Sequence, residues 1–378
     1  MQRRAQNKLV WDLDCALEEG TRPASFNTHG GAQVERTSLV GEIRTRLIAA
    51  KGDFFGVVFG PAGVGKTHAI REACRSHPKG VLYLEVYEPR DLARELAKTA
   101  RIPLDEHAHL LDYVVHRAGI KRYSACYRLP KDLQHEAVSH VLDILAERGA
   151  RFRKKHGFMP CLFIDGVDLL SKENPAAFGA LVDKAKHLAS NGSLRLVLVA
   201  GDGNALSLIE QTPSASKRDV PVHVRDISND EAEGYLTGCG LSAPLCKQIV
   251  GLTGGRFAHL EKALWVCGAA DGLDDATLYG AVRSALYADT ERALLRATVI
   301  NTSPDYELRK EVLRCVLTSG CVKVSELMER LCRRWSYASV EAAIGELVKN
   351  SVIRPGDQNM LLAHSKLSET YLRETLKL

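Results

Sequence analysis

The sequence predicts an α/β fold on a parallel sheet, followed by a helical segment and a small domain of helices and a hairpin. Short apolar runs alternate with helical patterns between residues 54 and 200, which is typical of βαβ units. From about residue 227 the apolar spacing is helical only. Near the C-terminus, three helical segments precede two apolar stretches separated by a turn. We therefore expect a parallel sheet with helices on both faces and two smaller domains after it.

The composition is that of an ordinary globular protein. Of its 378 residues 45% are hydrophobic and 26% charged, and the net charge of +5 permits contact with nucleic acid without indicating it. The ten cysteines include no C-x-x-C pair, which argues against a zinc site and favours a reduced, intracellular location in cytoplasm or nucleus. No apolar run of about 18 residues predicts a membrane helix.

The first elements lead to a glycine-rich loop. An amphipathic helix is predicted over residues 7–20, a loop over 21–34 and a second helix over Leu39–Ala50. The apolar run Phe54–Phe59 has the length of a buried strand. It is followed by eight residues that match the pattern G-x-x-x-x-G-K-[ST] at every fixed position, namely Gly60, Pro61, Ala62, Gly63, Val64, Gly65, Lys66 and Thr67. The next residues, His68 to Cys74, have a helical pattern.

A glycine-rich loop between a strand and a helix is the arrangement that binds nucleotide phosphates. Glycines adopt backbone angles closed to other residues, so main-chain N–H groups can point toward a phosphate. The helix N-terminus adds positive partial charge. We expect the eight loop residues and His68 to hold ATP, Lys66 to reach its β- and γ-phosphates, and the Thr67 hydroxyl to bind Mg²⁺.

Three further core strands are expected beyond this loop. The strands are Gly80–Val86, Cys161–Asp165 and Leu194–Ala200, with helices over 91–100, 106–123, 131–154 and 175–190. Asp165 ends an apolar run, as in a Walker-B strand, whose Asp holds Mg²⁺ through water or the Thr67 hydroxyl. Asp202 and Asn204 follow the last of these strands. Because ligands bind beyond the carboxyl ends of parallel strands, these polar residues are expected near the nucleotide.

The C-terminal part is predicted to begin with helices only. Ser228–Glu231 has the pattern of a capping box, Ala243–Leu252 is a second helix, and a third runs from Arg256 to about Cys267. Helices over 306–318, 325–334 and 337–350, then two short strands, form a winged-helix pattern. The predicted domains are an N-terminal helix and linker (1–33), the core (34–226), a helical lid (227–300) and a winged-helix-like domain (301–378).

With these motifs the chain resembles the AAA+/STAND branch of P-loop ATPases, and within it the ATPase module of crinkler effectors and the origin-type AAA+ proteins. The resemblance covers about residues 34–270. Besides the phosphate loop, it rests on Val34-Glu35-Arg36, Phe163–Asp168, Val199–Gly203, Ser216-Lys217-Arg218 and Thr253-Gly254-Gly255-Arg256. It implies an AAA+-like P-loop NTPase sheet, an α-helical lid and a C-terminal winged helix. The N-terminal translocation motif of crinkler proteins is not found in residues 1–33, so the sequence does not predict secretion as an effector, nor does it exclude it.

The resemblance also implies roles for single residues. Arg218 stands where an arginine finger would reach the γ-phosphate of a neighbouring subunit in a homo-oligomer; the alternative is a surface arginine beside Lys217. Arg256 opens a lid helix and matches a sensor-2 arginine that contacts the γ-phosphate, the alternative being a solvated helix-start residue. Asp202 or Asn204 matches sensor 1.

One position departs from the pattern of active ATPases. The residue after the Walker-B Asp is usually the Glu that acts as general base, and here it is Gly166. Asp168 lies three residues after Asp165 and either takes that role or caps a helix. We therefore expect slow ATP hydrolysis or a nucleotide-controlled switch.

Three functions are compatible with these residues. The first is an ATPase or switch in which ATP and ADP favour different lid positions and the winged helix contacts a protein partner. The alternative is an origin-type ATPase that binds duplex DNA, although the predicted recognition helix Tyr337–Glu346 carries Glu341 and Glu346 and no basic residue before Lys349. The third is a scaffold that the nucleotide only stabilises.

Overall fold

The computed structural model describes residues 2–24, 36–88, 92–102, 131–201, 205, 208–209, 219–270, 272–296, 305–350, 352–356 and 359–376. The expected helix over 106–123 and the motif residues Val34, Glu35, Asp202–Asn204 and Ser216–Arg218 lie outside them. The chain divides into two compact units. Among the described residues, the first unit holds 2–24, 36–60 and 66–224, and the second holds 61–65 and those from 225 onward.

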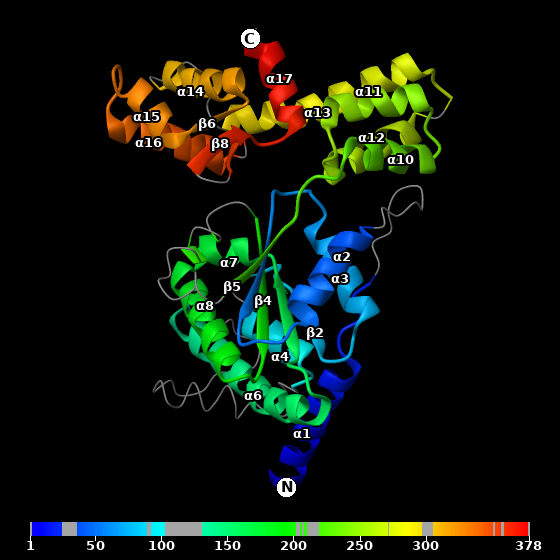
Figure 1. The fold of residues 1–378 in the computed structure, drawn as a ribbon, viewed down its shortest axis with the longest axis vertical. Helices are drawn as coiled ribbons and strands as arrows, with labels where there is room; N and C mark the ends of the chain where they lie inside the picture. The colour runs from blue at the N-terminus through cyan, green and yellow to red at the C-terminus, as the bar shows by residue number, and fades with distance from the viewer. Residues whose placement is uncertain are drawn as a thin grey trace. The chain divides into compact units, whose positions relative to one another are not determined.

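The first unit is built on a sheet of five parallel strands (Figure 1). The strands are β1 (Phe55–Phe59), β2 (Val81–Glu85), β3 (Cys161–Asp165), β4 (Arg195–Ala200) and β5 (Asp219–His223). Their order across the sheet is β2-β3-β4-β1-β5. The predicted parallel sheet is therefore confirmed, and four strands lie where the sequence predicts them. The fifth, in which Val220 and Val222 alternate with other residues, was not predicted; it lies at the sheet edge, where Pro221 is tolerated.

Helices cover both faces of this sheet (Figure 1). They are α1 (Gln2–Glu19), α2 (Thr37–Ile43), the π-helical turn η1 (Arg44–Ile48), α3 (Lys66–Ser76), α4 (Leu92–Thr99), α6 (Lys131–His156), α7 (Val167–Glu173) and α8 (Pro175–Ser190). Residues of α1, α4, α6, α7 and α8 share one apolar core with alternate strand residues such as Leu82 and Ile164. On the other face α3 packs on β2, and Leu47 of η1 lies against Gly56 of β1.

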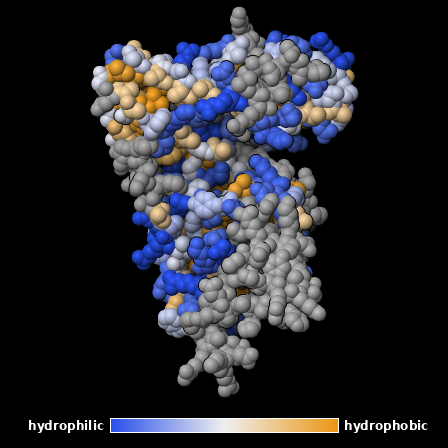
Figure 2. Space-filling view, turned by 180° about the vertical axis from the view of Figure 1, so that it is seen from behind, coloured by the Kyte–Doolittle hydropathy of each residue, from blue (hydrophilic) through white to orange (hydrophobic). Residues whose placement is uncertain are grey.

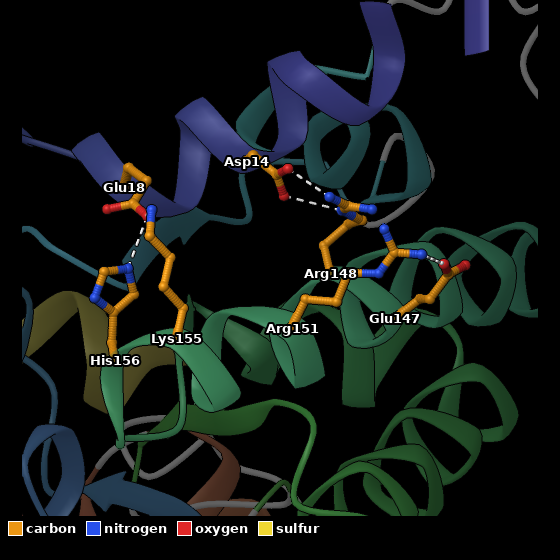
Figure 3. A network of polar contacts seen from close by, with 7 residues as sticks. All are labelled: Asp14, Glu18, Glu147, Arg148, Arg151, Lys155 and His156. Carbon is orange, nitrogen blue, oxygen red and sulfur yellow. Dashed lines mark hydrogen bonds and ion pairs between the residues drawn. The ribbon is translucent and has the colours of Figure 1, made fainter. Parts of the chain in front are cut away.

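The N-terminal helix α1 is an integral part of this unit. Leu13 and Leu17 are buried in the same core as the strands, and α1 packs along α6. Figure 3 shows the polar contacts that join the two helices, which are Arg148 with Asp14, Lys155 with Glu18 and His156 with Glu18. Hydrogen bonds from Lys155 and His156 to the charged carboxylate lower the pKa of Glu18 to about 2.

A buried arginine holds the segment that precedes β1. Arg195 begins β4 and is fully buried. Its guanidinium donates to the main-chain oxygens of Leu47, Ala50 and Gly52 at 2.8–3.0 Å and lies over the ring of Phe54. Burial lowers the pKa of this arginine. The guanidinium of Arg195 thus provides hydrogen-bond donors for carbonyl groups at the end of η1 and just after it. At a helix end such groups have no partner within the helix.

The second unit contains the four lid helices. They are α10 (Asn229–Gly238), α11 (Ala243–Thr253), α12 (Phe257–Ala269) and α13 (Asp275–Arg296). Ser228 and Glu231 form the predicted capping box. The helices share a core that includes Leu236, Ile249 and Leu260. Beside it, residues of the same helices line a cavity of about 730 Å³, and Figure 2 shows apolar surface over this helical part.

The rest of the second unit has the order of elements of a winged-helix domain. The elements are α14 (Tyr306–Ser319), β6 (Cys321–Lys323), α15 (Val324–Leu331), α16 (Tyr337–Lys349), β7 (Ile353–Pro355), β8 (Met360–Ala363) and α17 (Lys366–Leu376). The expected hairpin is part of a three-stranded sheet in which β8 lies between β6 and β7. The sequence did not reveal β6 or α17, and α17 packs on α11 and α13. None of the helices in the described ranges is long and apolar enough to cross a membrane.

Candidate functional site

The phosphate loop occupies the turn between β1 and α3. Gly63 and Gly65 have φ angles of +79° and +91°, a region that residues with a side chain rarely adopt. The glycines of the motif are therefore required by the backbone of this turn. Lys66 is the first residue of α3, and its ammonium donates to the main-chain oxygen of Gly60 at 2.6 Å. The ammonium group of Lys66 thus lies against the first residue of the loop that is predicted to bind phosphates.

The carboxylate of Asp165 lies beside the next residue of α3. Asp165 ends β3 and is 5% exposed. The Thr67 hydroxyl donates to it, and the Tyr83 hydroxyl lies 3.1 Å from its Oδ2. Burial raises the pKa of Asp165, which means that the charged form is poorly solvated there. A buried carboxylate in contact with a hydroxyl is a donor set that fits Mg²⁺, which takes oxygen ligands.

Asp168 lies in the first turn of α7 and contacts a different strand end. Its Oδ2 accepts a hydrogen bond of 2.6 Å from the main-chain N–H of Gly201, which follows β4. No side chain caps the N-terminus of α7, whose N-cap residue is Gly166. The alternative that Asp168 caps a helix is therefore wrong. Its carboxylate instead binds Gly201, the first residue after β4.

Arg256 is buried rather than solvated. It is the N-cap residue of α12 and is 1% exposed, so the alternative of a solvent-exposed helix-start arginine is wrong. Its Nε and Nη2 donate to the two carboxylate oxygens of Asp226. Its other hydrogen bonds, each 3.0 Å long, go to the main-chain oxygens of Ala62 and His364. One guanidinium therefore links the middle of the phosphate loop, the lid and the end of β8.

Two histidines beside this arginine are held neutral. Burial, and next the positive charge of Arg256, lower the pKa of His259 to about 4 and that of His364 to about 3. At neutral pH neither ring adds a positive charge next to the guanidinium.

The predicted site residues fall into three groups. Lys66, Thr67 and Asp165 are brought together, and His68 follows Thr67 in the first turn of α3. Pro61, Ala62 and Val64 lie in the same loop, while Asp168 and Arg256 have the separate partners described above. Asp202, Asn204 and Arg218 lie outside the described residues.

Sequence reasoning missed four polar residues around these groups. Arg71 of α3 contacts Tyr83 and Glu85 of β2, and Asp226 holds Arg256. A signal existed for Glu85, because it ends an apolar strand in the same way as Asp165. No local pattern marks Tyr83, Arg71 or Asp226, because their partners are remote in the sequence.

Residues 49–208 match the family of AAA domains. No curated protein sequence matches the chain significantly. Among solved structures, a Walker-type ATPase of Pyrococcus abyssi is similar over 93% of this chain and 98% of its own, with a TM-score of 0.60 and 14% identity. Cdc6p from Pyrobaculum aerophilum gives a TM-score of 0.43 at 13% identity, over 96% of this chain and 98% of that one. A STAND protein with a tetratricopeptide repeat sensor, from Pyrococcus horikoshii, gives a TM-score of 0.39 at 13% identity, over 94% of this chain and 44% of that one.

The last two TM-scores are too low to carry an argument, whereas the first shows a shared fold. The loop and the strand order agree with that fold. Residues 49–208 are thus similar to AAA domains, and the chain has the α/β fold of a Walker-type, AAA+-like P-loop ATPase.

Proposed function

We propose that this protein binds ATP with Mg²⁺ at the phosphate loop, hydrolyses it slowly, and uses the nucleotide state to change the contacts of its lid and winged-helix domain. The contact between the Thr67 hydroxyl and the buried Asp165 carboxylate carries the proposal. It supports the proposal because a hydroxyl and a carboxylate suited to Mg²⁺ meet beside Lys66, and phosphoryl transfer to water uses such a pair.

Thr67 and Asp165 are the residues that would hold Mg²⁺. The ion would neutralise charge on the β- and γ-phosphates as the bond between them breaks. Lys66 would exchange its hydrogen bond to Gly60 for the phosphates, and Gly63 and Gly65 permit a loop conformation that presents N–H groups to them. The Tyr83 hydroxyl keeps the Asp165 carboxylate oriented.

The proposed switch rests on Arg256. As a sensor-2 arginine it would contact the γ-phosphate, and four of its five N–H groups already donate to Asp226 and to the main-chain oxygens of Ala62 and His364. A γ-phosphate that Arg256 contacts would compete with these acceptors for the guanidinium. Since only ATP has a γ-phosphate, ATP and ADP would favour different arrangements of the lid (227–300) and the winged-helix domain (301–378).

The remaining parts of the proposal concern partners. Arg218 would serve as an arginine finger in a homo-oligomer, and the winged helix would bind a protein, as in a crinkler-type effector or another STAND-like switch. DNA binding is the less favoured alternative. Arg309, Arg314 and Arg330, around α14 and α15, lie in ion pairs with Glu346 or Glu311 rather than forming a basic surface of unpaired cations.

Calorimetric titration with Mg·ATP tests the site. Lys66→Ala should weaken binding by roughly 10–100-fold, the equivalent of one charged hydrogen bond of about 1.5–3 kcal/mol. Lys172→Ala, which removes an exposed lysine of α7, is the matched control and should bind like the wild type. Equal affinity of Lys66→Ala and wild type would refute the site. ATP turnover measured against protein concentration tests the oligomer, because a finger supplied by a neighbour makes the rate per subunit rise.

A further inference from the structure

We propose that Glu85, at the end of β2, is the general base for ATP hydrolysis and replaces the carboxylate that is missing at Gly166. This inference rests on the proposed ATPase function and assigns a residue to it that the family pattern does not.

The sheet places Glu85 directly beside the metal-binding carboxylate. Glu85 and Asp165 are register partners at the carboxyl ends of the neighbouring parallel strands β2 and β3. The Tyr83 hydroxyl lies 3.3 Å from Glu85 Oε2 and 3.1 Å from Asp165 Oδ2, so one phenol bridges the two carboxylates. Side chains two apart on a strand point to the same face, and this is the face on which α3 packs. Glu85 therefore belongs to the same constellation as Lys66, Thr67 and Asp165.

Position 166 cannot supply the base itself. Gly166 has a φ of +81°, and a Cβ there would lie 3.1 Å from the main-chain oxygen of Val86. A glutamate would be strained at this position, and the close neighbour is the residue that follows Glu85. The end of β2, where Val86 leaves no room for a side chain at position 166, thus carries the carboxylate of Glu85.

The alternative acidic residue is already engaged. Asp168 accepts a 2.6 Å hydrogen bond from Gly201 N–H. Glu85 is also in contact, through Oε2, with Arg71 and Tyr83, but it is 24% exposed, so water can reach it. Its partner Arg71 contacts Glu85 Oε2 and donates to the Tyr83 hydroxyl, which fixes the carboxylate in place. The alternative is that Glu85 has only a structural role as the ion-pair partner of Arg71. The experiment must distinguish this role from that of a general base.

The chemistry that Glu85 would perform is proton transfer from water. As the water oxygen forms its bond to the γ-phosphorus, Glu85 takes a proton from that water. The bond between the γ-phosphorus and the bridging oxygen breaks, and ADP leaves with its electron pair. The proton then passes to phosphate or solvent, so that ATP and water give ADP, phosphate and a proton.

The test compares the rate of ATP hydrolysis with the affinity for Mg·ATP in the 378-residue chain. Glu85→Gln should lower the rate of Mg·ATP hydrolysis by about 100-fold or more, the usual contribution of a general base. Its affinity for Mg·ATP, measured by calorimetry, should stay within threefold. Glu173→Gln, on the exposed side of α7, is the matched control and should keep both values. Arg71→Gln breaks the ion pair but keeps the carboxylate, and should lose less than tenfold in rate.

Each result decides between the interpretations. Glu85→Gln that hydrolyses ATP within threefold of wild type would overturn the role of Glu85 and leave the ATPase function standing. Arg71→Gln as slow as Glu85→Gln would also overturn it, because the ion pair and not the base would then matter. Wild-type protein that binds Mg·ATP without any turnover would remove the hydrolytic part of the proposed function, and the base with it.

Discussion

Replacing Arg256 by methionine should destabilise the second unit more than any surface substitution. Arg256→Met keeps an unbranched apolar chain but removes the guanidinium that binds Asp226, Ala62 and His364. The arginine side chain is 2% exposed, so water does not replace these bonds in the native structure. The substitution leaves a carboxylate and two main-chain oxygens without their donor.

The expected loss of unfolding free energy follows from the burial of this ion pair. Removing one partner of a buried ion pair costs about 3–5 kcal/mol. Asp226 is 35% exposed and can regain water on one side, which places the expected loss at the lower end, about 3 kcal/mol. For a unit of this size that corresponds to a melting temperature lower by roughly 6–12 °C.

Tryptophan fluorescence in urea measures this loss. The three tryptophans are Trp11, Trp265 and Trp335, so a Trp11→Phe background confines the signal to the second unit. Arg292→Met is the matched control, because Arg292 pairs with Asp289 on the exposed side of α13 and its side chain is 66% exposed. It should cost less than about 1 kcal/mol, as surface ion pairs do.

Equal unfolding free energies for the two arginine variants would refute the reasoning. That result would mean that the bonds of Arg256 contribute no more than a solvated pair, and the proposed coupling of loop, lid and β8 through it would lose its physical basis.

Two further predictions concern the first unit. The stability that Glu18 contributes should be present above pH 4.5 and disappear as the pH falls toward about 2, because folding lowers the pKa of this carboxyl. The difference in unfolding free energy between wild type and Glu18→Gln should therefore shrink over that range, and a constant difference would contradict it. Arg195→Met should cost about 1–3 kcal/mol in urea unfolding, since the buried carbonyl of Leu47 and the more accessible carbonyls of Ala50 and Gly52 lose a charged donor; a loss well below about 1 kcal/mol would show that water replaces it.

Local chemistry explains what could be predicted from residue order. The phosphate loop needs glycine where φ is positive, as at Gly63 and Gly65, so a single stretch of chain identifies it. The end of β3 at Asp165 and the capping box at Ser228 are likewise properties of a few neighbouring residues. The fifth strand was not predicted although Val220, Val222 and Val224 alternate with other residues, because the apolar stretch is short and a proline inside it, Pro221, argues against a strand.

The sequence by itself determined the phosphate loop, the Walker-B carboxylate, the alternation of strands and helices, and the helical C-terminal half. Each of these depends on the spacing of a few residues that are close together in the chain. Only the tertiary structure decided which strands are neighbours, and therefore that Glu85 lies beside Asp165. It also decided that Arg256 is bound by Asp226 and that Arg195 binds the end of η1. These contacts join residues that are 30 or more positions apart, and burial makes them strong by removing the water that would otherwise compete.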